Sequence, residues 1–161
     1  MKKKIGEIEL GGKVYFSDPC YGTKVGFFEN TLEVIPGKYN VYITRSESLN
    51  EFIRDRITNL FIVHKDYYKN FKKMPKGDKK SLSTAVDSGT CGIYDSNYFE
   101  KYHTENDVDD NWYDENVIKM DDFKITDGKG AISSSGIGDG CYPVYAEYDK
   151  NKAFAIRINY L

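Results

Sequence analysis

The clearest pattern along the chain is a two-residue alternation of apolar and polar side chains. Residues 38–45 place Tyr39, Val41 and Ile43 at every second position. Because successive side chains of a strand point to opposite faces of a sheet, this segment predicts a strand with one buried face. Residues 153–161 alternate in the same way. The pattern therefore predicts a fold made mainly of strands.

Turn residues separate the other segments of this kind. Gly11 and Gly12 suit a tight turn inside residues 5–16, which form a hairpin or two short strands. Pro36 and Gly37 end the next strand. The remaining strands are expected at residues 31–35, about 56–64 (paired with the strand before it), 81–87, 91–94, from 131 onward and 142–148.

Helical spacing is limited to two places. Residues 96–102 can form a helical turn, capped by Asp95 or Ser96. Residues 105–122 contain eight acidic residues and one lysine. We expect a helix of about ten residues that begins near Asp109 or Asp110, because acidic side chains in a first turn interact favourably with the helix dipole.

Two further segments are predicted to be irregular. Residues 46–55 form a loop or a short helical turn. Residues 65–80 hold seven lysines together with Pro75 and Gly77, which predicts a mobile basic loop. The elements together predict one mainly β domain over residues 1–161. Its expected architecture is an antiparallel β-sandwich or partly open barrel with one or two short helices.

Composition narrows the functional classes. With 23 basic and 25 acidic residues, the chain has no overall field that would attract nucleic acid. The longest apolar run covers only residues 60–63, so no membrane span is expected. No apolar segment follows the first lysines, and the cysteine count of three is odd. Both observations favour reduced thiols in a cytosol, and we expect a cytoplasmic protein.

Three turns combine a carboxylate with small residues and hydroxyls, and they form the candidate site. Asp18, Asp87 and Asp139 each follow or precede a predicted strand, where irregular backbone is tolerated. If the turns meet, their oxygens and exposed glycine amides can bind a small polar ligand, or the oxygens can bind a hard cation. The alternative is that each Asp caps its own turn. The predicted ligand-binding residues are Asp18, Tyr21, Asp87, Ser88, Ser133, Ser134, Ser135, Gly138, Asp139 and Tyr142.

The same three turns carry a family resemblance. The phrases are Ser17-Asp-Pro-Cys-Tyr, Val86-Asp-Ser-Gly-Thr and Ser133-Ser-Ser-Gly-Ile-Gly-Asp-Gly-Cys-Tyr-Pro-Val-Tyr. They resemble a family of small bacterial and phage proteins that carry a domain of unknown function, in which the last phrase is a hairpin. In that family the positions of Cys91 and Cys141 often look like Ala or Ser, which argues against a shared catalytic or metal role for these thiols. The resemblance implies a shared fold and site but no reaction.

Catalysis and metal binding have weaker support. Cys20 with His64, oriented by Asp18, would be a candidate nucleophile and base, because a thiolate needs a neighbouring base or cation. Nothing in the spacing of these residues requires that pairing. The cysteines also lack the close paired spacing of zinc sites, so no metal site and no cofactor are expected.

Three functions follow from these observations. The leading hypothesis is a non-enzymatic binding module, implied by the resemblance to be a phage or prophage accessory protein, which captures a small polar ligand through the glycine hairpin at 133–140. The second is an anti-defence inhibitor that contacts a host or defence protein through the acidic segment. The third is a small hydrolase that uses Cys20 or a serine. The predicted partner-binding residues are Asp107, Asp109, Asp110, Asp114 and Glu115.

Overall fold

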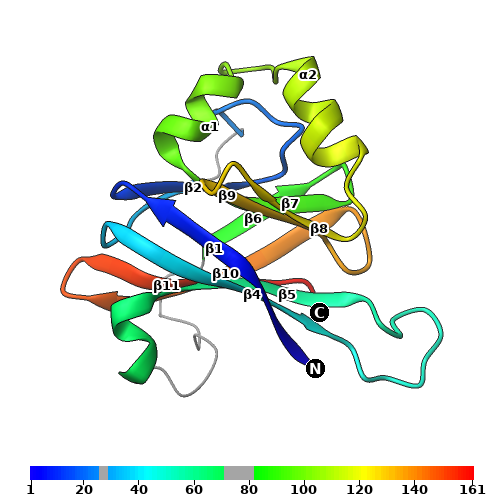
Figure 1. The fold of residues 1–161 in the computed structure, drawn as a ribbon. Helices are drawn as coiled ribbons and strands as arrows, with labels where there is room; N and C mark the ends of the chain where they lie inside the picture. Colours follow the sequence, from blue (N-terminus) through cyan, green and yellow to red (C-terminus); the bar gives the residue numbers. More distant parts are fainter. Residues whose placement is uncertain (26–28, 71–81) are drawn as a thin grey trace.

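The fold is a sandwich of two antiparallel sheets with a helical layer on one side (Figure 1). It is seen in a computed structural model, which describes residues 1–25, 29–70 and 82–161. Most of the predicted basic loop, at 71–80, therefore lies outside the described residues. The architecture confirms the prediction of a mainly β fold with two antiparallel sheets that do not close into a barrel.

Six strands form the larger sheet, in the order β1-β4-β5-β11-β10-β6. Neighbouring strands in this sheet run antiparallel throughout. The predicted pairing of the segment at 38–45 with the strand that follows it is present, with Tyr42 opposite Phe61. The strands are β1 (Lys2–Leu10), β4 (Gly37–Arg45), β5 (Ile57–His64), β6 (Leu82–Val86), β10 (Gly140–Asp149) and β11 (Lys152–Asn159).

Five strands form the smaller sheet, in the order β3-β2-β7-β9-β8. This sheet is also antiparallel. The strands are β2 (Lys13–Ser17), β3 (Thr31–Glu33), β7 (Thr90–Asp95), β8 (Phe123–Thr126) and β9 (Gly130–Ser134). The sequence pattern missed β8, because a strand of four residues leaves too few positions for an alternation to show.

The apolar faces of the two sheets meet in one core. Tyr39, Val41 and Ile43 are fully buried there, as the alternation predicted, and Phe16 and Ile93 reach the core from the smaller sheet. Burying a side chain of this size stabilises a fold by about 1.5–3 kcal/mol. The apolar positions of the two-residue alternation in the sequence are therefore the positions that pack between the two sheets.

A layer of short helices covers the outer face of the smaller sheet (Figure 1). α1 (Ser96–Tyr102) is capped by Asp95, whose carboxylate accepts the Tyr98 N–H at 3.2 Å. α2 (Asp110–Tyr113) continues into the π-helical turn η2 (Asp114–Ile118), so a helix begins where the acidic segment predicted one. Its buried Trp112 packs on Tyr94 and Tyr98 at ring distances of 6.3 Å.

Two local predictions need correction, and one open alternative is decided. Residues 5–16 form two strands and not a hairpin, because β1 pairs with β4 while β2 pairs with β3 and β7. The glycine-rich segment is not the predicted hairpin, since β9 belongs to the smaller sheet and β10 to the larger one. The first part of the predicted basic loop forms the 3-10 helix η1 (Lys65–Asn70). A turn signal marks where a strand ends, but it does not say which sheet the next strand joins.

No helix within the described residues is long and apolar enough to cross a membrane.

Candidate functional site

The structure brings the three Asp turns together at one end of the sandwich. The connections from β6 to β7 and from β9 to β10 both cross between the sheets, and they lie side by side because β6 pairs with β10 and β7 with β9. The Ser135 N–H donates to the Gly89 carbonyl at 2.9 Å, and the Gly89 N–H donates to Asp139 Oδ1 at 3.0 Å. We call residues 17–22, 87–89 and 135–140 the three-turn surface.

Asp18 joins the first turn to the second. Its side chain is fully buried, and its two carboxylate oxygens accept four hydrogen bonds. The donors are the Cys20 N–H at 2.7 Å, the Asp87 N–H at 2.8 Å, the Ser88 N–H at 2.7 Å and the Ser88 hydroxyl at 2.7 Å. Hydrogen bonds to a charged acceptor are the stronger class in proteins. The carboxylate therefore acts as a clip, and its oxygens face the protein instead of solvent.

The other two carboxylates of the surface are exposed. Asp87 accepts the Tyr21 hydroxyl at 2.5 Å through one oxygen, and Asp139 accepts the Gly89 N–H through one oxygen. Burial, followed by the hydrogen bond to Asp87, raises the pKa of Tyr21 above its usual value, so the phenol stays protonated and donates. The residues that the structure describes make no hydrogen bond to the second oxygen of either Asp side chain, which leaves that oxygen available to a ligand.

The glycine loop between β9 and β10 is closed by its own side chains. The Ser135 hydroxyl and the Tyr142 hydroxyl both donate to the Gly138 carbonyl, at 2.7 and 2.6 Å. Gly136 has a φ of 63°, and a Cβ there would lie 2.7 Å from the Ile57 carbonyl oxygen. The left-handed backbone and this close approach explain why glycine is needed at that position.

The remaining serines of the segment face different ways. Ser133 is fully buried, and its hydroxyl lies 3.1 Å from that of Tyr160 in the core. Ser134 is half-buried at the end of β9, where its N–H donates to the Asp122 carbonyl. Of the three predicted serines, only Ser135 shapes the loop directly.

The cysteines lie in different environments. Burial raises the pKa of Cys20 to about 12, and the carboxylate of Asp18 adds to that effect. Burial likewise raises the pKa of Cys91 to about 12, and Cys141 is exposed. At neutral pH the Cys20 and Cys91 groups are thiols, which are poor nucleophiles. Among the residues that the structure places, no group of three or more His, Cys, Asp or Glu side chains could hold a metal ion.

Both ring nitrogens of His64 interact with nearby backbone groups. Its Nδ1 accepts the Asp66 N–H at 3.1 Å, and its Nε2 lies 3.0 Å from the Pro36 carbonyl. With Nδ1 accepting, Nε2 carries the proton and donates it to that carbonyl. In the described part of the chain no contact joins His64 to Cys20, so the geometry does not assemble the predicted nucleophile and base.

Two neighbours of the site were not predicted. His103, at the end of α1, lies with Nε2 3.0 Å from the Pro19 carbonyl. Tyr113, from α2, lies beside Ser88, and burial raises the pKa of its phenol while the contact with Ser88 opposes the rise. His103 is more than eighty positions away from Pro19 in the sequence, and Tyr113 is more than twenty positions away from Ser88. No local sequence pattern carries such information.

Some acidic side chains of residues 105–122 stabilise the helix of that segment through a cap and an ion pair. Asp109 caps α2 by accepting the Trp112 N–H at 2.8 Å, and Asp107 accepts the Val108 N–H at 2.9 Å. Glu115 forms an ion pair with Lys119. The other two predicted contact residues, Asp110 and Asp114, are exposed and are the first residues of α2 and η2.

The chain belongs to a protein family, because residues 10–156 match the family model described as "Protein of unknown function (DUF4241)". This confirms the predicted resemblance to a family of unknown function, and the matched range contains all three Asp turns. The description names no activity. No curated protein and no solved structure matches the chain.

Proposed function

We propose that this family member is a non-enzymatic binding module and that the three-turn surface is its recognition site. The observation that carries the proposal is the Asp18 clip, which ties two turns together through four hydrogen bonds to one buried carboxylate. A site held in this way loses little conformational freedom when it binds, so more of the contact energy becomes affinity.

The exposed groups indicate the chemistry of the ligand. Asp87 and Asp139 each offer a free carboxylate oxygen, while Gly89 and Gly138 have open space where a side chain would stand. A ligand can therefore approach the backbone closely at both glycines. The charges favour a small polar ligand with a cationic amine, because a carboxylate binds ammonium through charge-assisted hydrogen bonds.

Binding fits the geometry better than hydrolysis. The thiol of Cys20 is protonated at neutral pH, because its pKa is raised to about 12. Both ring nitrogens of His64 interact with backbone groups, and Ser133 is buried in the core. A hydrolytic nucleophile needs a base within hydrogen-bond reach. These side chains do not provide that arrangement.

Thermal unfolding with a panel of small cations tests the proposal. The panel contains spermidine, lysine amide, agmatine, magnesium and calcium. We expect at least one organic amine to raise Tm. A ligand at a hundred times its Kd adds about 2.7 kcal/mol of stability, which for a chain of this size corresponds to roughly 5–10 °C.

A matched pair of double variants localises the effect. Asp87→Asn with Asp139→Asn removes both exposed charges of the site and is expected to abolish the shift. Asp110→Asn with Asp114→Asn removes two exposed charges from α2 and the adjoining η2 and should leave the shift unchanged. A panel without any shift, or an equal shift in both double variants, would overturn the proposal. A shift lost only in the α2 variant would instead favour the acidic segment as the contact surface.

The biological setting is a separate part of the proposal. A role as a phage or prophage accessory protein rests on the sequence resemblance alone. An anti-defence inhibitor acting through the acidic segment has a narrower basis, because Asp109 caps a helix and Glu115 is paired with Lys119. The exposed Asp110 and Asp114 remain available for such a contact.

A further inference from the structure

Arg157 lies on the outer face of the larger sheet, the face turned away from the smaller sheet and the helical layer (Figure 1). The residues on either side of it in β11, Ile156 and Ile158, are fully buried in the core between the sheets. Because successive side chains of a strand point to opposite faces, Arg157 points outward. The same alternation turns Tyr145 of β10 outward, and Tyr145 is directly opposite Arg157 in the strand register.

The guanidinium of Arg157 is held over an aromatic ring. Its central carbon lies 4.5 Å from the centroid of the Tyr145 ring, which is a cation–π contact. On the neighbouring strand β5, Phe61 is opposite Arg157 and is only 1% exposed. Arg157 itself is half-buried. The sheet therefore orients a cation that is partly removed from water.

Arg157 lacks the oxygen partner that every other arginine of the chain has. Arg45 forms an ion pair with Asp122 at 2.8 Å. Arg54 and Arg56 donate to backbone carbonyls at 2.9 and 3.3 Å. Within the part of the chain that the structure describes, the guanidinium of Arg157 has no hydrogen bond and no ion pair, and its Nε is buried without a partner.

An unpaired cation in this position needs an explanation. Burial lowers the pKa of Arg157, but a guanidinium remains charged at neutral pH. Removing a charge from water without an opposite charge or a hydrogen bond costs free energy. Glu147 lies on the same face of β10, two positions after Tyr145, yet it forms no ion pair with Arg157 in the described residues. The fold itself therefore does not supply the missing anion.

A second donor lies beside Arg157 on the same strand. Asn159 follows it by two positions in β11, so both side chains point to the outer face. Asn159 is half-buried, and its amide makes no hydrogen bond with the residues that the structure places. The amide NH₂ carries two donors that face the same surface as the guanidinium.

We propose that Arg157 and Asn159 form a binding site for an oxyanion, which is a carboxylate or a phosphate group. A guanidinium can donate to two oxygens of one such group at once, and these charge-assisted hydrogen bonds are the stronger class. The Tyr145 ring covers one side of the guanidinium and leaves its edge for the ligand. Because Nε is buried, the oxyanion binds through the two Nη nitrogens, and the Asn159 amide donates to a further oxygen.

The site differs in chemistry from the three-turn surface. That surface presents carboxylates and is proposed to bind an amine, whereas Arg157 and Asn159 present only donors. The two proposals therefore use probes of opposite charge, and either can fail without the other.

Titration of the full-length chain with sodium phosphate, and separately with sodium acetate, tests the proposal. Sodium chloride keeps the ionic strength constant, and proton–nitrogen NMR follows the Nε–H signals of the four arginines and the side-chain amide of Asn159. We expect the Arg157 and Asn159 signals to shift along one saturating curve with at least one of the two anions. Saturation with phosphate alone or acetate alone identifies which oxyanion the site prefers.

A matched pair of charge-conserving variants localises the binding. Arg157→Lys keeps the positive charge but removes the planar pair of Nη donors, so we expect a Kd at least fivefold weaker, measured from the backbone amide shifts of Tyr145. Arg54→Lys makes the same change at an exposed arginine on the loop at 46–56 and should leave the Kd unchanged.

Three outcomes would overturn the proposal. The first is that neither anion shifts the Arg157 signal in a saturating way. The second is that all four arginine signals shift together, which indicates general salt binding. The third is that Arg157→Lys binds the anion as tightly as the wild type does. Should Arg157→Lys fail to fold, the wild-type arginine signals alone decide between these outcomes and the proposed site.

Discussion

Asp18 shows how one side chain can organise residues far apart in the sequence. Its carboxylate accepts the backbone N–H groups of Cys20, Asp87 and Ser88 and also the Ser88 hydroxyl. Without these bonds the N–H groups of Cys20, Asp87 and Ser88 would lose their partner, and an unpaired buried donor costs about 1–3 kcal/mol. The local motif predicted an Asp that caps its own turn. The fold extends that role to a second turn about seventy residues away.

Replacing Asp18 by Asn is predicted to lower the free energy of unfolding by about 3 kcal/mol, because an amide NH₂ would face N–H donors and the negative charge would be lost. Urea unfolding followed by circular dichroism measures the change. Asp121→Asn is the control, since Asp121 is exposed and such changes usually stay within about 0.5 kcal/mol. Equal stability of the two variants would show that Asp18 is not a clip.

His103 is a second residue with long-range contacts. It is 3% exposed and stacks on Phe99 at a ring distance of 3.7 Å. Its two ring nitrogens lie 2.9 Å from the Phe99 carbonyl and 3.0 Å from the Pro19 carbonyl. Burial lowers the pKa of His103, while the two carbonyls oppose the change, and the net shift is downward. The neutral ring can donate to only one of the two carbonyls.

This shift predicts a pH dependence of stability. A base whose pKa is lowered on folding is protonated more readily in the unfolded protein than in the folded one. Its contribution to the free energy of unfolding is therefore complete above the unfolded pKa of about 6.5, and it declines as the pH falls below that value. We expect the free energy of unfolding to decrease from pH 7 to pH 5, and to decrease less in His103→Gln. Identical slopes in both proteins, or an NMR titration midpoint of His103 above about 6.5, would contradict the prediction.

At the scale of elements, the glycine loop differs most from expectation. The family resemblance implied a hairpin, but the loop connects β9 in one sheet to β10 in the other. A crossing of this kind needs the backbone to turn sharply against the core, and Gly136 is where that happens. Three glycines of the loop have positive φ values, which are 63°, 108° and 155° at Gly136, Gly138 and Gly140.

Gly136→Ala is predicted to destabilise the protein by about 1–2 kcal/mol more than Gly89→Ala. Both glycines have a left-handed φ, 63° and 69°, so both substitutions carry the same conformational cost of about 1–2 kcal/mol. Only at Gly136 would the new methyl group meet another atom, the Ile57 carbonyl oxygen at 2.7 Å, whereas nothing lies within 4 Å at Gly89. If Gly136→Ala and Gly89→Ala lower the free energy of unfolding in urea equally, the loop between β9 and β10 moves enough to accommodate the new methyl group.

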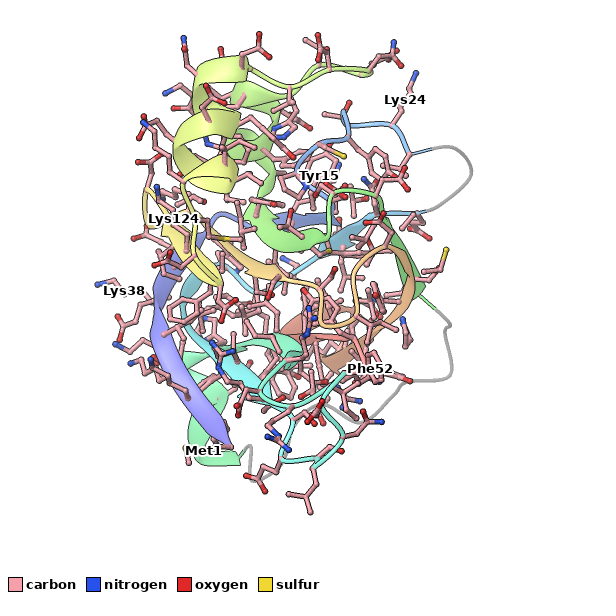
Figure 2. All side chains as sticks on the ribbon, turned by 90° about the vertical axis from the view of Figure 1, so that its right-hand side faces the viewer. Met1, Tyr15, Lys24, Lys38, Phe52 and Lys124 are labelled. Atoms are coloured by element: carbon pink, nitrogen blue, oxygen red, sulfur yellow. The ribbon has the colours of Figure 1, made fainter. Side chains whose placement is uncertain are left out.

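At the scale of the whole molecule, the sandwich explains why the site residues meet. Two connections cross between the sheets next to each other, and the turn after β2 is tied to them by Asp18. The same architecture places the loop between β4 and β5 (residues 46–56) beside the glycine loop, because Arg56 donates to the Gly136 carbonyl. Figure 2 views the molecule from this side. The three-turn surface for which we propose binding thus lies at one end of the sandwich.

The sequence by itself determined most of the strands, the position of α1 and the start of the acidic helix. These features depend on neighbours within a few positions, because alternation, capping and turn residues are local physical effects. Only the tertiary structure decided which sheet each strand joins. It also decided that the turns at 87–89 and 135–140 connect one sheet to the other, and that Asp18 binds Ser88. The partner of a strand can lie at any distance along the chain, so side-chain alternation records a buried face without naming the strand beside it. The same reasoning applies to His103, whose contact with Pro19 arises only when α1 covers the smaller sheet.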